Sequence, residues 1–121
     1  MDTIELQYLL DKSFILRSLN GVVCAKDQLP ERKPCHVHAY IVNTDDSDQP
    51  GEHWVAIYFK GNTATYFDSY GLPPFEQHMK SFLDNNTHSW TRNNVRLQSG
   101  NSAMCGVYCI FALDVLARGV I

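Results

Sequence analysis

The sequence contains no apolar run approaching the roughly 20 residues that a membrane-spanning helix requires. Met1 leads into acidic and amphipathic sequence rather than into the basic and apolar stretches of a secretory signal. Repeats and low-complexity segments are also absent. We therefore expect one globular domain, 1–121, with a modest core, in a reducing cytosolic, nuclear or viral setting rather than a secreted one.

Runs of lysine or arginine are missing as well. The formal net charge is −3, from ten Lys and Arg against thirteen Asp and Glu. A protein whose main task is to bind nucleic-acid phosphates normally carries a basic excess. The sequence therefore predicts neither nucleic acid nor a membrane among the partners of this chain, and we expect a monomer.

The four cysteines form no CxxC pair, which removes the commonest signal of a structural zinc site. Cys35 is followed closely by His36 and His38. In an extended segment, however, Cys35 points to one face and the two histidines point to the other. Because no second closely spaced ligand pair accompanies them, we expect no metal and no other cofactor.

The apolar patterns predict three helices. Two are amphipathic, at 2–12 and 74–86. The third, at about 103–118, has few polar positions, so we expect it to be buried on most sides against a sheet. Asn101 or Ser102 is its candidate N-cap, and Gly119 is its expected end.

Runs of β-forming residues predict strands at 36–44, 53–60, 63–70 and 93–99. The second and third are joined by Gly61–Asn62, which indicates a hairpin, and are apolar at nearly every position, as in central strands. Residues 13–34 carry mixed signals and are expected to be mostly irregular. The fold class is therefore α+β, with a small mixed or antiparallel sheet of three to five strands packed by helices.

Cys105 is the best candidate for a nucleophile. It falls in the first turn of the third predicted helix, where unpaired N–H groups and the positive end of the helix dipole favour a thiolate. Gly106 leaves the space beside the sulfur open. The alternative is a small buried apolar residue, which is what most free cysteines are. That alternative is favoured for Cys109, one turn later, and for the two remaining thiols, at Cys24 and Cys35.

A catalytic thiol needs a base, a group that orients the base, and donors for an oxyanion. His53 opens one strand of the predicted hairpin and Asp68 closes the other, so antiparallel pairing would make them cross-strand neighbours. Taken singly, they also fit a surface histidine and a turn aspartate. The side-chain amide of Gln98 could donate to the oxyanion beside the backbone N–H of Cys105, although alone it fits a polar residue at a strand end.

Four blocks, in this order, resemble the adenovirus-type cysteine proteases (adenain) and, more distantly, the Ulp/SENP-type proteases of ubiquitin-like proteins. They are IVNT (41–44), GEHWVAIYF (51–59), YFDSYGLPP (66–74) and QSGNSAMCGVYCIFAL (98–113). The resemblance implies a papain-related core with Cys105 as the nucleophile at the start of a buried helix. It assigns the base to His53, the orienting group to Asp68 (where adenoviral members tend to have glutamate), the oxyanion donor to Gln98, and substrate contacts to Trp54 and Gly106.

The resemblance implies a cysteine endopeptidase that cleaves viral precursor proteins near glycine-rich sites, in the virion and the host nucleus or cytoplasm. One alternative is an isopeptidase acting on host ubiquitin-like modifiers, although this chain has MCG where Ulp-type members usually have DCG. Another is a catalytically silent interaction domain on the same fold. The presence of residues for all four catalytic roles argues against the silent domain.

Three departures from the adenoviral pattern limit what the resemblance implies. Residues 80–97 contain no cysteine to pair with an activating peptide, the chain is slightly acidic, and it has no longer segment after the last predicted helix. We therefore expect neither the activating-peptide disulfide nor activation by DNA. A compact member, from another DNA virus or a Maverick/Polinton-like element, fits these departures.

Overall fold

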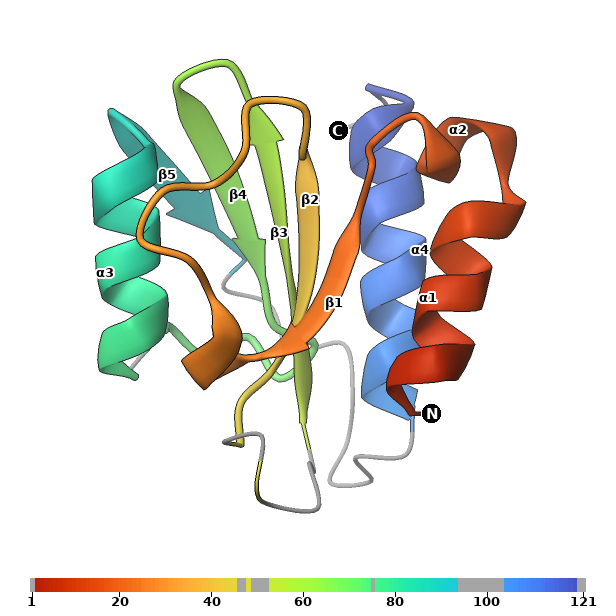
Figure 1. Cartoon of the computed structure of the whole chain (residues 1–121), viewed down its shortest axis with the longest axis horizontal. Helices are drawn as coiled ribbons and strands as arrows, with labels where there is room; N and C mark the ends of the chain where they lie inside the picture. Colours follow the sequence, from red (N-terminus) through yellow and green to blue (C-terminus); the bar gives the residue numbers. More distant parts are fainter. Residues whose placement is uncertain (1, 46–47, 49–52, 75, 94–103, 120–121) are drawn as a thin grey trace.

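The computed structural model describes residues 2–45, 48, 53–74, 76–93 and 104–119. Within these ranges, five strands form one mixed sheet in the order β1-β2-β3-β4-β5 (Figure 1). The outer pairs, β1 with β2 and β4 with β5, are parallel, whereas the inner pairs, β2 with β3 and β3 with β4, are antiparallel. Their bounds are β1 Val22–Ala25, β2 Ala39–Asn43, β3 Trp54–Lys60, β4 Thr63–Phe67 and β5 Ser89–Arg92. The predicted α+β class is confirmed.

Helices cover both faces of this sheet. One face carries α1, α2 and α4, and the other carries α3 (Figure 1). The helical elements are α1 Thr3–Lys12, α2 Phe14–Arg17, the short 3₁₀ helix η1 Lys26–Gln28, α3 Gln77–Asn86 and α4 Cys105–Ala117. None of the helices in the described ranges is long and apolar enough to cross a membrane.

The ends of two helices follow directly from local sequence. The Asp2 carboxylate accepts the Glu5 backbone N–H at 2.8 Å, and the Glu5 carboxylate accepts the Asp2 backbone N–H at 3.2 Å. This reciprocal capping box starts α1. Helix α4 stops at Arg118, and Gly119 follows with φ +70°, a conformation that glycine adopts without strain. The predicted first helix and the predicted end of the last one are both confirmed.

The β3–β4 hairpin sets the position of the residues that follow and precede it. Lys60 pairs with Thr63 across a two-residue turn, and the first residue of that turn, Gly61, has φ +60°, as a type II′ turn requires. The same register places Ala56 opposite Phe67. Continued by one residue, this register would place Asp68 opposite Val55. His53, two residues before Val55, is therefore a diagonal rather than a directly opposite neighbour of Asp68.

The two faces of the sheet make two separate cores. Ile41, Ala56 and Phe67 belong to the cluster under α1 and α4, whereas Ile57 and Tyr66 belong to the cluster under α3. Because side chains alternate between the faces and both faces are covered, β3 and β4 are apolar along most of their length. Their predicted place inside the sheet is confirmed.

One sequence prediction about these segments is wrong, and one strand was not predicted. Residues 13–34 are not mostly irregular, because they contain α2, η1 and β1. The strand β5, Ser89–Arg92, was not predicted, and residues 94–99 of the strand predicted at 93–99 fall outside the described residues. β5 is an edge strand whose side chains are mostly exposed, so it lacks the alternation of buried apolar residues that marks a strand in sequence.

The last helix differs from its prediction at its start and along one stripe. The N-cap position of α4 is held by Met104, whose side chain makes no capping hydrogen bond, and the predicted caps Asn101 and Ser102 lie outside the described residues. Most positions of the helix are buried or half-buried, as predicted. Met104 and, within the helix, Val107 and Phe111 are 48%, 37% and 63% exposed, because the helix forms an outer layer with α1.

Candidate active site

Cys105, His53 and Asp68 meet at one end of the sheet. At this end β3 begins, β4 ends and α4 begins, and it is the lower end of the strands as drawn in Figure 1. The backbone N–H of Trp54, the first residue of β3, donates to the Cys105 sulfur at 3.2 Å. This bond ties the start of α4 to the start of β3, and so places the thiol beside His53.

The imidazole of His53 is held by Asp68. His53 Nε2 lies 2.9 Å from Asp68 Oδ1, and the Asp68 residue is 4% exposed. The same carboxylate oxygen accepts the backbone N–H of Tyr70 at 2.8 Å. The Tyr70 ring covers the imidazole, with ring centroids 4.8 Å apart and planes tilted by 33°. Hydrogen bonding and stacking together fix the orientation of the imidazole ring.

The other imidazole nitrogen is left for the thiol. His53 Nδ1 is buried and has no hydrogen-bond partner in the described part of the chain. The His53 and Cys105 side chains lie close enough for each to shift the pKa of the other. Because Nε2 is hydrogen-bonded to Asp68, Nδ1 is the imidazole nitrogen that can face the thiol. The three side chains thus form a chain of thiol, imidazole and carboxylate.

Hydrogen bonds and charges shift the titration of both reactive groups. Burial lowers the pKa of His53, but hydrogen bonds and charges from Asp68 and Cys105 outweigh it and raise that pKa to about 9. Burial raises the pKa of the Cys105 thiol, but hydrogen bonds from His53 and from the Trp54 and Gly106 backbones, with the His53 charge, lower it overall. Both shifts favour a thiolate beside an imidazolium over a neutral thiol beside a neutral imidazole.

The structure brings together three of the predicted site residues and places two more beside them. Gly106 contributes its backbone N–H to the Cys105 sulfur. Trp54 contributes its backbone N–H, while its side chain is only 7% exposed and packs in the core cluster that contains Cys105. The substrate contacts predicted for both stay predictions. Gln98 lies outside the described residues, and its role as an oxyanion donor also stays a prediction.

The remaining cysteines differ from Cys105 in their surroundings. Cys109 is fully buried, and burial with the nearby charges of Cys105 and Asp68 raises its thiol pKa well above the usual value. Burial raises the pKa of the Cys24 thiol to about 11. Cys35 is exposed, and the described residues contain no group of three or more His, Cys, Asp or Glu side chains placed to hold a metal ion. The buried Cys109 and the half-buried Cys24 have the raised thiol pKa of unreactive cysteines.

Two residues of the site were missed by sequence reasoning. Tyr70 belongs to the DSYG turn, but nothing in the sequence shows that its ring covers His53. Asn93 follows β5 and hydrogen-bonds the backbone of Asp68 with its side chain. The sequence gives no signal for Asn93, because the strand before it, Ser89–Arg92, was not predicted.

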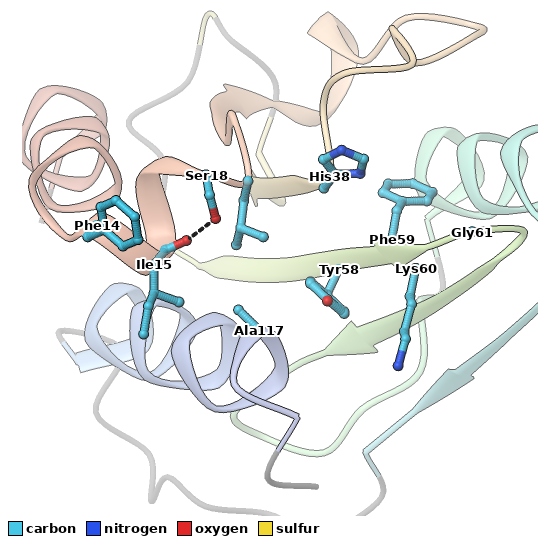
Figure 2. Close-up of a pocket in the computed structure, with 10 residues that line it drawn as sticks. Phe14, Ile15, Ser18, His38, Tyr58, Phe59, Lys60, Gly61 and Ala117 are labelled. Atoms are coloured by element: carbon cyan, nitrogen blue, oxygen red, sulfur yellow. Dashed lines mark hydrogen bonds between the residues drawn. The ribbon is translucent and has the colours of Figure 1, made fainter.

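Two hollows help to locate the site within the fold. One, of about 190 Å³, has His53 and Asp68 in its wall together with Thr44, Leu72 and Met79. The other, of about 490 Å³, lies at the far end of α4, and Figure 2 shows Tyr58, Lys60 and His38 around it. The lining of the second hollow contains neither His53 nor Asp68, so of these two hollows it is the first that borders the site.

The pKa of Cys105 can be tested by its rate of alkylation. We expect iodoacetamide to modify Cys105 at about pH 7 faster than it modifies Cys24, because the pKa of the Cys105 thiol is lowered and that of Cys24 is raised. Peptide-resolved mass spectrometry over a pH series separates the thiols, with exposed Cys35 as an internal reference. Equal rates for Cys105 and Cys35 at every pH would contradict the ion pair.

Comparison with known proteins yields a shared fold. No protein-family model and no curated protein sequence matches this chain. Among solved structures, a crystal structure of ASFV pS273R protease matches 94% of this chain and 57% of its own length, at 17% identity and a TM-score of 0.62. A Se-Met crystal structure of the same protease matches 70% of this chain and 36% of its own length, at 24% identity and a TM-score of 0.52.

The likeness shows the fold. The five-stranded mixed sheet packed by helices is the architecture that this chain has in common with the protease. The chain spans 36% and 57% of the two matched chains, so each has a substantial part with no counterpart here.

Proposed function

We propose that this chain is a cysteine endopeptidase in which Cys105 is the nucleophile, His53 the proton carrier and Asp68 the group that orients His53. The observation that carries the proposal is a thiol of lowered pKa at the start of α4, beside an imidazole hydrogen-bonded to a buried carboxylate. The fold shared with ASFV pS273R protease supports it.

In the first step, the Cys105 thiolate attacks the carbonyl carbon of the peptide bond and forms a C–S bond. The C–N bond then breaks, and the His53 imidazolium gives its proton to the departing amine. The products are a thioester on Cys105, a neutral His53 and the free amine end of the substrate. Asp68 stays ionised throughout and stabilises the imidazolium.

In the second step, water attacks the thioester carbon while His53 accepts a proton from that water. The C–S bond breaks, and the acyl group leaves as a carboxylic acid that loses its proton to solvent. Thiolate and imidazolium are thereby restored. Each step passes through an oxyanion, for which we propose the Gln98 side chain and the Cys105 backbone N–H as donors.

The proposed substrates are viral precursor proteins cleaved near glycine-rich sites, and the proposed place of action is the virion and the host nucleus or cytoplasm. The order and content of the four sequence blocks support this choice. The test is to incubate the purified protein with a peptide library and, in parallel, with ubiquitin- and SUMO-based activity probes, using Cys105→Ala as the blank. Cleavage of glycine-containing peptides without probe labelling is the expected result.

The other outcomes of that experiment contradict the proposal in different ways. Probe labelling without peptide cleavage would assign the chain to the isopeptidases of ubiquitin-like modifiers. Cleavage that persists in Cys105→Ala would show that the activity does not depend on the proposed nucleophile. Absence of both peptide cleavage and probe labelling would favour the third interpretation, an interaction domain that has this fold but no activity.

The pKa shifts predict a bell-shaped dependence of kcat/KM on pH. Activity requires the thiolate and the protonated imidazole together. It should fall at low pH, below the usual thiol range, as Cys105 gains a proton, and at high pH as His53 loses one, with the alkaline limb at about 9. An alkaline limb near the ordinary histidine range would show that Asp68 does not raise the pKa of His53 in solution.

A further inference from the structure

The side chain of Asn93 hydrogen-bonds both backbone groups of Asp68. The backbone N–H of Asp68 donates to Asn93 Oδ1 at 2.8 Å, and Asn93 Nδ2 donates to the backbone C=O of Asp68 at 2.6 Å. The Asn93 backbone N–H also donates to the C=O of Tyr66 at 3.3 Å. One residue beyond β5 is therefore attached at three points to the end of β4.

These bonds fall where the sheet ends. Pairing of β4 with β5 stops at Tyr66 and Arg92, and pairing of β4 with β3 stops at Phe67. Asp68 is the next residue, is 4% exposed, and has left the ladder that would satisfy its N–H and C=O. Buried backbone groups need partners, and a side-chain amide offers one donor group and one acceptor, as a neighbouring peptide group would. Asn93 thus takes the place of a missing strand neighbour.

The other bonds of Asp68 come from the turn that follows it. Its backbone C=O also accepts the N–H of Gly71 at 2.8 Å, and its Oδ1 accepts the N–H of Tyr70 at 2.8 Å. The backbone of Asp68 is therefore fixed by β5 on one side and by the turn on the other. With the backbone fixed, the carboxylate oxygen lies within 2.9 Å of His53 Nε2.

We propose that Asn93 is a positioning residue of the site, whose side-chain amide holds the backbone of Asp68 so that the carboxylate meets His53. This inference rests on the proposed function for its effect on catalysis. Its effect on the Cys105 thiol can be measured without any substrate. Asn93 acts through Asp68.

Removing the amide should release the link between sheet and carboxylate. In Asn93→Ala the Asp68 backbone loses two hydrogen bonds, and the carboxylate is no longer held against the imidazole. The pKa of His53 then falls, and the Cys105 thiolate loses part of the stabilisation that it receives from the imidazolium. Misplacement of a catalytic group by about 1 Å can cost about 100-fold in rate, so we expect kcat to fall by about 10- to 100-fold with little change in KM.

The decisive measurement is the alkylation rate of Cys105 against pH in the wild type and in Asn93→Ala. We expect the rate at about pH 6.5 to fall by about 10-fold, which corresponds to a rise of about one unit in the apparent pKa of the thiol. At about pH 10, where the thiol ionises without help, the two proteins should react alike. A purely structural loss would instead change the rate at both pH values.

Asn86 offers a matched control. Its Oδ1 accepts the backbone N–H of Lys33 at 2.9 Å, and its Nδ2 donates to the backbone C=O of Glu31 at 3.0 Å. Asn86 therefore ties two distant segments by the same pair of bonds, but at the end of α3, among residues that take no part in the site. Asn86→Ala should lower the melting temperature and leave the pH dependence of Cys105 alkylation unchanged.

A second variant, Asn93→Ser, keeps a small polar residue that cannot bridge both groups of Asp68, and should shift the alkylation profile in the same direction as Asn93→Ala. If circular dichroism shows that both variants are folded and both keep the wild-type alkylation profile, the role of Asn93 is overturned. The proposed protease function would not be affected by that result. Failure of both variants to fold would assign Asn93 a general structural role, against the proposal. Absence of low-pH reactivity in the wild type itself would overturn the proposed function and the role of Asn93 together.

Discussion

Replacing Cys105 by alanine should abolish peptide cleavage, with a loss of about 10⁴-fold or more in kcat, because removal of a covalent nucleophile disables the whole catalytic unit. Cys105 is the thiol that interacts with His53, and its sulfur also accepts the Trp54 backbone N–H. The measurement is single-turnover and steady-state cleavage of the best peptide from the library. Circular dichroism and a thermal melt show whether the variant is folded.

Cys109→Ala is the matched control for that experiment. Cys109 lies one turn further along α4, is completely buried, and has a thiol pKa raised well above the usual range. Its replacement should leave most of the activity and lower the free energy of unfolding by about 1 kcal/mol through lost packing. A dead Cys109→Ala beside an active Cys105→Ala would show that the nucleophile has been assigned to the wrong residue.

The part of the site that could be predicted from sequence is the part fixed by a short hairpin. Two residues, Gly61 and Asn62, separate β3 from β4, and a turn of that length determines which residues pair. Counting outward from the turn brings His53 near Asp68 without knowledge of the rest of the fold. The count does not give their exact alignment. The two residues lie diagonally to one another, just beyond the last β3–β4 pair.

Features that depend on contacts between distant segments could not be predicted in this way. β1 has four residues and is defined by its parallel pairing with β2, which a local pattern does not reveal. β5 exposes most of its side chains at the edge of the sheet, so its sequence lacks a buried face. The role of Asn93 could not be predicted for the same reason as β5, since a polar residue after an unrecognised strand gives no local sign of what it bonds.

The apolar character of α4 predicted its burial but not the stripe that stays exposed. Val107 and Phe111 lie on that stripe. Composition reports how apolar a helix is, whereas the number of layers decides how many of its faces are covered. Here α1 and α4 form a single layer on one side of the sheet, which leaves one face of each helix outward (Figure 1).

His53→Ala should reduce kcat/KM by about 10³-fold or more, because it removes both the proton carrier and the positive charge that stabilises the thiolate. Burial alone raises the pKa of Cys105, and the backbone N–H groups of Trp54 and Gly106 would be its remaining stabilising partners. The matched control is His38→Ala. His38 is exposed and lines the hollow at the other end of the sheet (Figure 2), so its replacement should leave activity unchanged.

The pH dependence of the residual activity separates loss of the base from loss of the fold. In the wild type, activity should fall above about 9 as His53 loses its proton. In His53→Ala no imidazole remains beside Cys105. A thiol that must ionise unaided becomes more reactive as pH rises, so the residual rate should increase through the same range. An unchanged alkaline limb in the variant would mean that another group sets it. Because a misfolded protein would lose activity at every pH, opposite slopes in the two proteins would identify His53 as the partner of Cys105.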